Sequence, residues 1–215
     1  MASSLISSLR HFPQARWGFT IYRTTYTPLS DRHFPRIIET INSWTKRGAD
    51  KDYSLVNPYL NLTHRSAYNL LCARYRPTVM ENPHEFNDIP LSSVRSHFET
   101  WGSQQDINLV WSSQTRACLV IDDEVVEALA DAVPWIEGVT DDTAVYRQNS
   151  LRWWVKVVEA EPDLEDTYFG PGDYDGTMMK ASVLALWPLW KDITDPEPTM
   201  ADIYDVGTEG GIYVG

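Results

Sequence analysis

The stretch Trp17–Tyr26, WGFTIYRTTY, carries the strongest strand signal in this chain of 215 residues. Most of its residues are β-branched or aromatic, and Pro13 and Pro28 bound it, a pattern typical of a β-strand. Because side chains alternate along a strand, its two faces are Trp17, Phe19, Ile21, Arg23 and Thr25 against Gly18, Thr20, Tyr22, Thr24 and Tyr26. We expect an interior strand with Phe19 and Ile21 buried, around which later elements pack.

The composition allows one domain with a sizeable core. The length suggests a single domain, and 43% hydrophobic residues support a core. Nine Trp and eleven Tyr indicate a core or pocket built from aromatic rings with polar ends. We predict a flexible arm over residues 1–16, an α+β domain over 17–193, and an acidic tail without fixed structure over 194–215.

The charge distribution and the two cysteines limit which kinds of partner and which cellular compartment we expect. The net charge is −12, with +4 in residues 1–121 and −16 in residues 122–215, which argues against nucleic acid. An acidic half indicates a solvated surface, with a basic partner as the alternative. Cys72 and Cys118 lie in apolar runs without a CxxC motif, which favours buried thiols over a disulfide or a zinc site.

No apolar run reaches the length of a membrane span, so no membrane partner is expected. Together with the thiols, this predicts a cytoplasmic protein. The Ser-rich first thirty residues carry Arg10 and Arg16 and no acid, so a mitochondrial location is the alternative.

The first half of the chain alternates helix and strand patterns. Apolar residues at helical spacing predict a helix over 31–47, ended by Gly48. Residues 49–69 are polar and mixed and predict a long loop. Leu70–Met80 predicts a strand in which Pro77 forces a bulge or an edge position, and Asn82–Pro90 predicts a loop.

The second half predicts the elements that complete the sheet. These are a helix from Ser92 or Ser93 to Trp101, a hairpin of 107–111 and 115–121, a helix over Glu124–Ala132 capped by Asp122 or Asp123, strands over 151–160 and 177–184 around a loop at 163–176, and a last short helix. The order predicts an α+β fold, with a single mixed or antiparallel sheet and helices mainly on one face, ferredoxin-like or related. An open α/β sheet is the alternative.

Motifs for nucleotides, metals and nucleophiles are absent from the sequence. It contains no GxGxxG, GxxxxGK[ST], GxSxG or HExxH, so we expect no cofactor and no metal. His84 lies with Glu85 and Asp88 in the proline-framed loop. A histidine beside two carboxylates suits a general base or a weak metal site, and a solvated loop is the alternative.

Cations on the predicted strands form a second candidate site. Alternation places Arg152, Trp154 and Lys156 on one strand face, and Lys180 lies between Met178 and Ser182 on another. With Arg23, and with Tyr22 or Tyr26 at the edge, they form a cationic, aromatic-lined site for a carboxylate or an enolate oxygen. The alternative is that the lysines extend to solvent or pair with acids such as Glu159 and Glu161. Arg23, Tyr22, Tyr26 and Trp154 are therefore the candidate ligand-binding residues, and His84, Lys156 and Lys180 the candidate catalytic ones.

Several segments together resemble a known group of proteins. WGFTIYRTTY, SSVRSHFETW, RACLVIDDEVVEAL, WWVKVVEAE and MMKASVLALWPLW are similar to segments of a family of small uncharacterised intracellular proteins of filamentous fungi. The resemblance covers most of residues 17–192 and leaves out 49–69 and the acidic tail. It implies a fungal, intracellular, single-domain protein, and it carries no activity to this chain.

Two functions from different classes fit the sequence. The first is a non-catalytic interaction or small-ligand-binding protein, whose partner is a small apolar or aromatic molecule or another protein. The second is a cofactor-independent enzyme of isomerase, cyclase or lyase type that acts on a small aromatic or polyketide-like metabolite of secondary metabolism. A deep pocket containing Arg23, Lys156 or Lys180 would favour the enzyme, and a filled core would favour the binding protein.

Overall fold

The computed structural model describes residues 5, 9–12, 15–56, 61–106, 112–160, 178–195 and 197–215. For residues 55–56, 61–65 and 112–113 it describes the backbone alone. The predicted strand at 107–111 and the predicted loop at 163–176 lie outside the described residues. So does most of the predicted arm over residues 1–16, although Leu5 and Leu9 are buried in the core.

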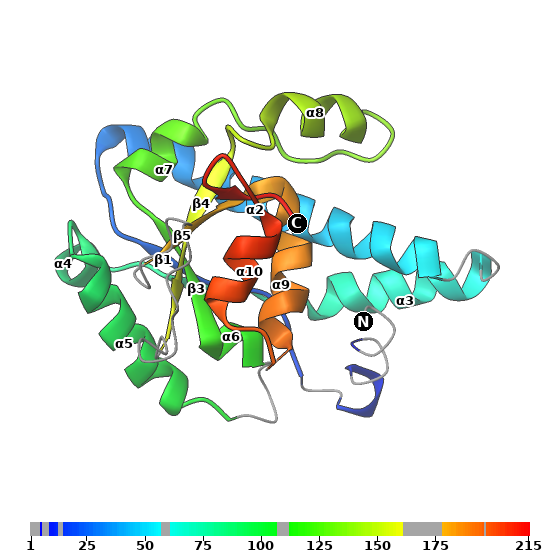
Figure 1. Cartoon of the computed structure of the whole chain (residues 1–215), viewed down its shortest axis with the longest axis horizontal. Coiled ribbons are helices and arrows are strands. Elements are labelled where there is room, and N and C mark those ends of the chain that lie inside the picture. Colours follow the sequence, from blue (N-terminus) through cyan, green and yellow to red (C-terminus); the bar gives the residue numbers. More distant parts are fainter. Residues whose placement is uncertain are drawn as a thin grey trace.

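A single seven-stranded mixed sheet organises the described chain (Figure 1). Its order is β2-β1-β3-β4-β5-β7-β6, and its strands are β1 Thr20–Arg23, β2 Thr78–Met80, β3 Ala117–Ile121, β4 Trp154–Glu159, β5 Met179–Ser182, β6 Thr208–Glu209 and β7 Ile212–Tyr213. The strand β1 runs parallel to β2 and β3, β4 is antiparallel to β3 and β5, and β7 is parallel to β5 and antiparallel to β6. The predicted α+β fold with one mixed sheet is confirmed.

The opening stretch forms the interior strand that the sequence predicts. The strand β1 is shorter than Trp17–Tyr26 and lies between β2 and β3. Phe19 and Ile21 are fully buried on the face that packs on the largest helix, and Tyr22 is fully buried on the opposite face. The predicted separation of the two strand faces is therefore confirmed.

That largest helix, α2 (Pro28–Val56), is much longer than the predicted helix over 31–47. It passes through Gly48, where Trp187 of α9 (Leu186–Thr194) occupies the space that a side chain would need. A Cβ at Gly48 would lie 2.6 Å from the Trp187 Cβ. The glycine therefore allows two helices to approach closely. It does not end the helix.

The predicted loop at 49–69 and most of the predicted strand Leu70–Met80 are wrong. The end of α2 and the helix α3 (Asn61–Arg74) occupy this part of the chain, and only Thr78–Met80 is a strand. Ala67, Leu71 and Tyr75 recur every four residues and are buried, which is a helical period that the polar residues between them obscure. Of the bulge or edge position predicted from Pro77, the edge position is observed, because β2 lies at one edge of the sheet.

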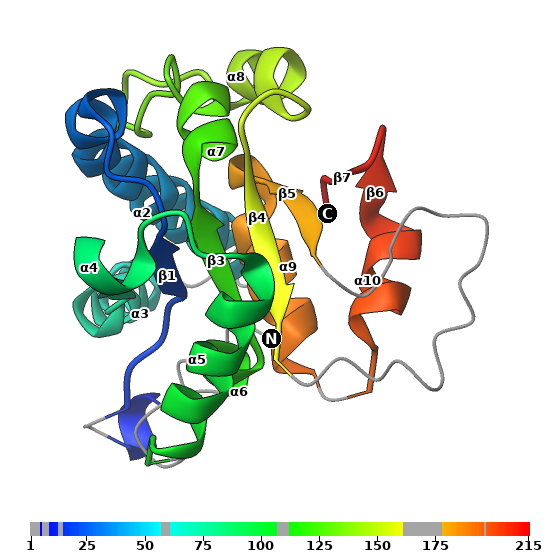
Figure 2. The ribbon, with the colours of Figure 1, turned by 90° about the vertical axis from the view of Figure 1, so that its left-hand side faces the viewer.

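Helices cover both faces of the sheet. Figure 2 shows α4 (Pro83–Phe86) and α5 (Leu91–Ser103) in front of the sheet, with α2 and α9 behind it. The helix α5 matches its predicted position and buries Val94 and Phe98. The segment predicted as a loop, Asn82–Pro90, contains the one turn of α4, which the Asn82 side chain caps.

The middle of the chain follows the prediction in part. Residues 112–116 form the short helix α6 (Ser112–Arg116), so the predicted strand 115–121 shortens to β3. Asp122 caps α7 (Asp123–Ala128) as predicted, and its carboxylate accepts a hydrogen bond from the Val125 N–H at 3.1 Å. The helix α8 (Asp142–Asn149) had no predicted counterpart.

The predicted unstructured tail is wrong within the described residues. A 3-10 turn (Val183–Ala185) leads from β5 into α9, and α10 (Met200–Gly207), β6 and β7 follow. Thr199 and Asp202 form a reciprocal cap at the start of α10. Ile203, Tyr204 and Tyr213 are buried, and the Tyr213 hydroxyl donates to an Asp192 carboxylate oxygen at 2.6 Å. These apolar residues outweigh the acidic composition on which the prediction rested.

Candidate functional site

The sheet register brings three of the predicted site residues together. Lys156 on β4 lies directly opposite Lys180 on β5. The Lys180 ammonium is 3.9 Å from the centre of the Trp154 ring, two residues along β4 from Lys156. Lys156, Lys180 and Trp154 thus form one cluster: alternation predicted the shared face of Trp154 and Lys156, and the register adds Lys180.

Two carboxylates from α7 neutralise this lysine pair. Glu124 bridges the lysines, with one oxygen 2.8 Å from the Lys156 Nζ and the other 2.8 Å from the Lys180 Nζ. Asp122 adds a contact of 2.5 Å to the Lys156 Nζ. Burial opposes the charge on Lys156, but the hydrogen bonds to both acids outweigh it and raise its pKa. Lys156 is therefore an ammonium ion at neutral pH, which is unable to act as an amine nucleophile.

Arg23 lies on the other face of the sheet. It pairs with Ile121 of β3, whereas Lys156 pairs with Val120, and successive residues point to opposite faces. Its guanidinium forms an ion pair with Asp31 and another, of 3.2 Å, with Glu81. The Tyr26 ring is 4.5 Å away. Arg23 and Tyr26 thus form a second cluster, and both clusters match the predicted alternative of pairing with acids, although through acids other than Glu159 and Glu161.

Tyr22 belongs to a third group, on the face covered by α4 and α5. Its hydroxyl lies 2.7 Å from the Nδ1 of His97, and burial raises the pKa of Tyr22 above its usual range. The Nε2 of His97 is 3.5 Å from a carboxylate oxygen of Glu85. The ring of Phe86 packs edge-on against both Tyr22 and His97, so the imidazole has a fixed orientation. In the region of α4 and α5, His97 is therefore a histidine whose ring is held in place by its neighbours.

His84, the histidine singled out in the sequence, is exposed at the start of α4. Its backbone N–H donates to the Asn82 side chain, and the neighbouring Glu85 contacts His97 and Asn82. The described residues contain no group of three or more His, Cys, Asp or Glu that could hold a metal ion.

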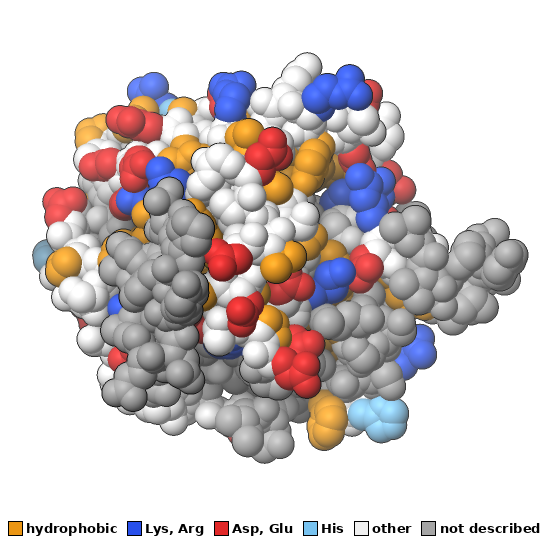
Figure 3. All heavy atoms as spheres, viewed as in Figure 1, with side chains coloured by type: hydrophobic (Ala, Val, Ile, Leu, Met, Phe, Trp, Pro, Cys, Tyr) orange, Lys and Arg blue, Asp and Glu red, His pale blue; other side chains and the backbone are white. Residues whose placement is uncertain are grey.

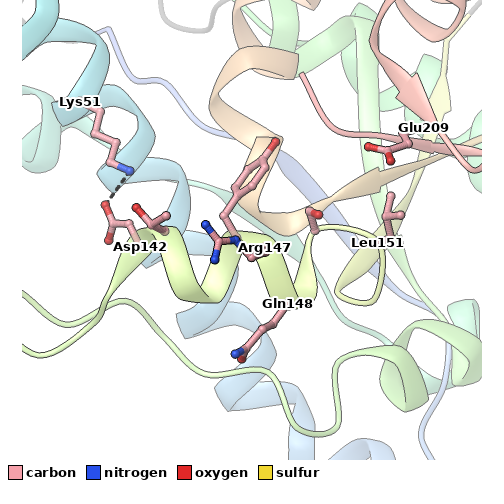
Figure 4. A pocket seen from close by; sticks show the side chains of 9 residues that line it. Lys51, Asp142, Arg147, Gln148, Leu151 and Glu209 are labelled. Atoms are coloured by element: carbon pink, nitrogen blue, oxygen red, sulfur yellow. Dashed lines mark ion pairs between the residues drawn. The ribbon is translucent and has the colours of Figure 1, made fainter.

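An open hollow of about 780 Å³ lies beside α8 (Figure 4). Lys51 of α2 and Asp142 form an ion pair at one end, Glu209 of β6 and Leu151 lie at the other, and Arg147 lies between them. Its remaining lining residues are Thr143, Tyr146, Gln148 and Ser150. Residues from α2, α8 and β6, which are far apart in the sequence, thus line the same hollow.

The two ends of the hollow differ in how their charges are satisfied. Asp142 accepts hydrogen bonds from Arg47 at 2.9 Å, Lys51 at 2.6 Å and the Trp135 indole at 2.7 Å. Burial works against its charge, but these donors prevail and lower the pKa of Asp142. Arg147 and Glu209 are exposed, and neither takes part in an ion pair with another described residue. An incoming ligand can therefore meet one cation and one anion that the described part of the protein leaves unpaired.

Sequence reasoning missed most of these partners. Glu124 was visible two residues after a cap, but only the register shows that it faces both lysines. Glu209 fell in the predicted tail, and Arg147 fell in a segment with no predicted element. The pairing of Tyr22 with His97 joins residues 75 positions apart, and the sequence carries no signal for it.

Comparisons with protein families, with curated proteins and with solved structures give no match for this chain. Among the described residues, no helix has the length and apolar character that a membrane crossing requires. The functional argument therefore rests on the geometry above.

Proposed function

We propose that this is a non-catalytic binding protein whose ligand occupies the hollow beside α8. One contrast carries the proposal. The cations that suggested a ligand site, Arg23, Lys156 and Lys180, are already neutralised by carboxylates of the protein itself. In the hollow beside α8, by contrast, Arg147 and Glu209 face solvent without an ion partner among the described residues. A charge that is already paired has little to gain from a ligand, whereas an unpaired one can bind it.

The lining indicates the chemistry of the ligand. Arg147 suits a carboxylate and Glu209 suits an ammonium group, while the amide of Gln148 can donate or accept hydrogen bonds. Leu151 and the Tyr146 ring supply the apolar contact. A small zwitterion with an apolar side chain, such as a short peptide, fits this lining better than a wholly apolar molecule does.

The test combines mass spectrometry of the native protein with calorimetric titration. We expect a small zwitterion to co-purify, and di- and tripeptides containing leucine or phenylalanine to bind. Arg147→Ala and Glu209→Gln should each weaken binding about tenfold, the loss of one charged hydrogen bond. Arg32→Ala and Glu127→Gln remove exposed charges elsewhere and serve as matched controls. Equal binding by all four variants would remove the hollow from consideration.

A cofactor-independent enzyme is the second candidate, favoured by the group of Tyr22, His97 and Glu85. The buried Tyr22 hydroxyl contacts one ring nitrogen of His97, and the other ring nitrogen lies beside Glu85. The His97 side chain is 35% exposed, so a substrate can reach it. An oriented imidazole beside a carboxylate suits proton transfer in an isomerase, cyclase or lyase. If this candidate is right, His97→Gln should abolish turnover of an aromatic or polyketide-like substrate in a screened panel while the fold, measured by circular dichroism, is kept.

We also retain the fungal origin and the cytoplasmic location as proposals. The first rests on the resemblance of the five sequence segments. The second rests on the two free cysteines, of which Cys118 is fully buried, with a raised pKa caused by burial. Imaging of the tagged full-length chain in a fungal cell would separate a cytoplasmic from a mitochondrial protein.

A further inference from the structure

We propose that Tyr146 holds Glu209 at a fixed position in the hollow beside α8, and that this makes the hollow selective for ligands with a free amino group. The inference rests on the proposed function, because it concerns how that hollow recognises a zwitterion. Tyr146 lines the hollow, and its hydroxyl donates a hydrogen bond of 2.6 Å to the carbonyl of Val214. The two residues are 68 positions apart, so this bond joins α8 to the segment that follows β7.

Glu209 lies in a tight hairpin that β6 and β7 form with a turn of two glycines. Gly210 and Gly211 have positive φ angles of 57° and 79°, as the two central residues of such a turn require. The strand pairing places Glu209 directly opposite Ile212, across this turn. We call β6, the turn and β7 the C-terminal hairpin. Because the turn is short and the two strands are paired, the position of Glu209 follows the position of β7.

The C-terminal hairpin is attached to the rest of the sheet through β7. That strand pairs with β5 and buries Tyr213, and β6 lies beyond it at the edge of the sheet. At the base of the hairpin, the Val214 N–H donates to the Gly207 carbonyl at 2.7 Å. The Tyr146 hydroxyl therefore bonds to the base of the hairpin and connects it directly to α8.

Tyr146 thereby links the two charges of the hollow that have no ion partner among the described residues. Arg147 is the next residue on α8, and Glu209 lies on the hairpin that the Tyr146 hydroxyl contacts. Figure 1 shows this hairpin below α8, and Figure 3, from the same side, shows apolar and acidic side chains next to each other at the surface between them. A cation and an anion on separate elements bind the two ends of a zwitterion best when their separation is fixed beforehand, because binding then orders less of the protein.

The Tyr146 hydroxyl remains a hydrogen-bond donor at neutral pH. Burial raises the pKa of Tyr146, and the negative charge of Glu209 raises it further. Both causes keep the phenol protonated, so the bond to the Val214 carbonyl is present whenever Glu209 is ionised. The bond and the charge that it positions therefore coexist at the pH at which a zwitterion binds.

The test is a double-mutant cycle, measured by calorimetry with two probes. These are the dipeptide leucyl-phenylalanine and its N-acetyl derivative, which has no ammonium group. Tyr146→Phe removes only the hydroxyl and should weaken binding of the dipeptide about two- to tenfold, the range for one hydrogen bond. It should leave binding of the acetylated dipeptide unchanged, because that probe forms no ion pair with Glu209. When Tyr146→Phe is combined with Glu209→Gln, the dipeptide should bind as it does to Glu209→Gln alone.

A matched control removes a tyrosine hydroxyl away from the hollow. The Tyr75 hydroxyl donates to the Asn42 side chain at 2.9 Å, and neither residue lines the hollow. Tyr75→Phe should therefore leave the binding of both probes unchanged. Thermal melts check that each variant is folded.

The outcomes distinguish this inference from the proposed function. If Tyr146→Phe leaves dipeptide binding unchanged while Glu209→Gln weakens it, the positioning role is wrong and the proposed function stands. If Tyr146→Phe weakens both probes equally, or if its effect adds to that of Glu209→Gln, the hydroxyl does not act through Glu209 and the positioning role is again wrong. If Glu209→Gln itself has no effect on dipeptide binding, the positioning role and the proposed function are both overturned.

Discussion

Replacing Gly48 with Ala should destabilise the protein, although alanine is the better helix former. In an exposed helix the change would add about 0.5–1 kcal/mol of stability. Here the new Cβ would lie 2.6 Å from the Trp187 Cβ and 3.2 Å from its Cγ. Ordinary carbon contacts are about 3.5–4.0 Å, so α9 must shift by about 1 Å. Overpacking of this kind costs about 1–3 kcal/mol; less the gain in helix propensity, the net loss is at most about 2.5 kcal/mol, and we expect about 1–2 kcal/mol because Trp187 is held in a packed cluster.

Trp187 is poorly placed to move out of the way. Its ring stacks on Trp190 with centroids 5.5 Å apart, and it meets Trp17 edge-on at 5.5 Å. Its indole N–H donates to Asp52 of α2 at 3.2 Å. Relief of the clash must therefore disturb an aromatic cluster, which near-ultraviolet circular dichroism can detect.

The measurement is urea unfolding with a parallel thermal melt. A loss of 1–2 kcal/mol corresponds to a fall in Tm of roughly 2–8 °C for a chain of this size. Gly102→Ala in α5 is the matched control, because a Cβ there would lie 3.5 Å from the Thr115 Cβ, an ordinary contact, and should stabilise slightly. If both variants are equally stabilised and the near-ultraviolet spectrum of Gly48→Ala is unchanged, the close approach of α2 and α9 is refuted.

Three further predictions concern ion pairs and the C-terminal segment. In urea titrations, Lys156→Met should lower the free energy of unfolding by about 1–2 kcal/mol and Lys180→Met by less than about 1 kcal/mol. The difference is expected because Lys156 has two carboxylate partners and Lys180 has one. Equal losses in the two variants would contradict the prediction. The pKa of Asp142 is lowered in the folded state, so the contribution of its carboxylate to stability is complete above about pH 5 and is lost as the pH falls below about 4. The Tm difference between the wild type and Asp142→Asn should therefore shrink as the pH falls through that range. A constant difference would count against the ion pairs of Asp142. Deleting residues 200–215 removes five buried apolar side chains and should cost on the order of 5 kcal/mol, visible as a large fall in Tm; an unchanged melt would show that the segment does not pack on the sheet.

The sequence predicts best where one local pattern agrees with the packing. β-branched and aromatic residues around Phe19 alternate, and the face that they define is buried. Asp122 precedes a short apolar run and caps a helix as expected. At Gly48 the local signal and the packing disagree: glycine commonly ends helices, but here it allows close contact with Trp187, a residue 139 positions away. No local pattern contains that contact.

The sequence predicted which residues could belong to the candidate site, but it did not predict which of them lie together. Alternation correctly placed Trp154 and Lys156 on one strand face, and the register then brings Lys180 opposite Lys156. The position of Arg23 relative to them depends on the pairing of β1 with β3 and of β3 with β4. A shift of one residue in either pairing would reverse the face. No local pattern in the sequence determines the register between β1 and β3, which are nearly a hundred residues apart, or between β3 and β4.

Our proposal of a binding protein rather than an enzyme rests on where charge remains unpaired among the described residues. A catalytic lysine must be a neutral amine or an ammonium ion that contacts the substrate. Lys156 is an ammonium ion, but it is paired with Asp122 and Glu124 and so is not available to a substrate. Arg147 and Glu209 lie at an open hollow without such partners among the described residues. Polar groups that stabilise a fold are paired within it, and groups that bind a ligand are exposed to meet it. On that distinction the residues beside α8, rather than the cations of the sheet, are the ones to test first.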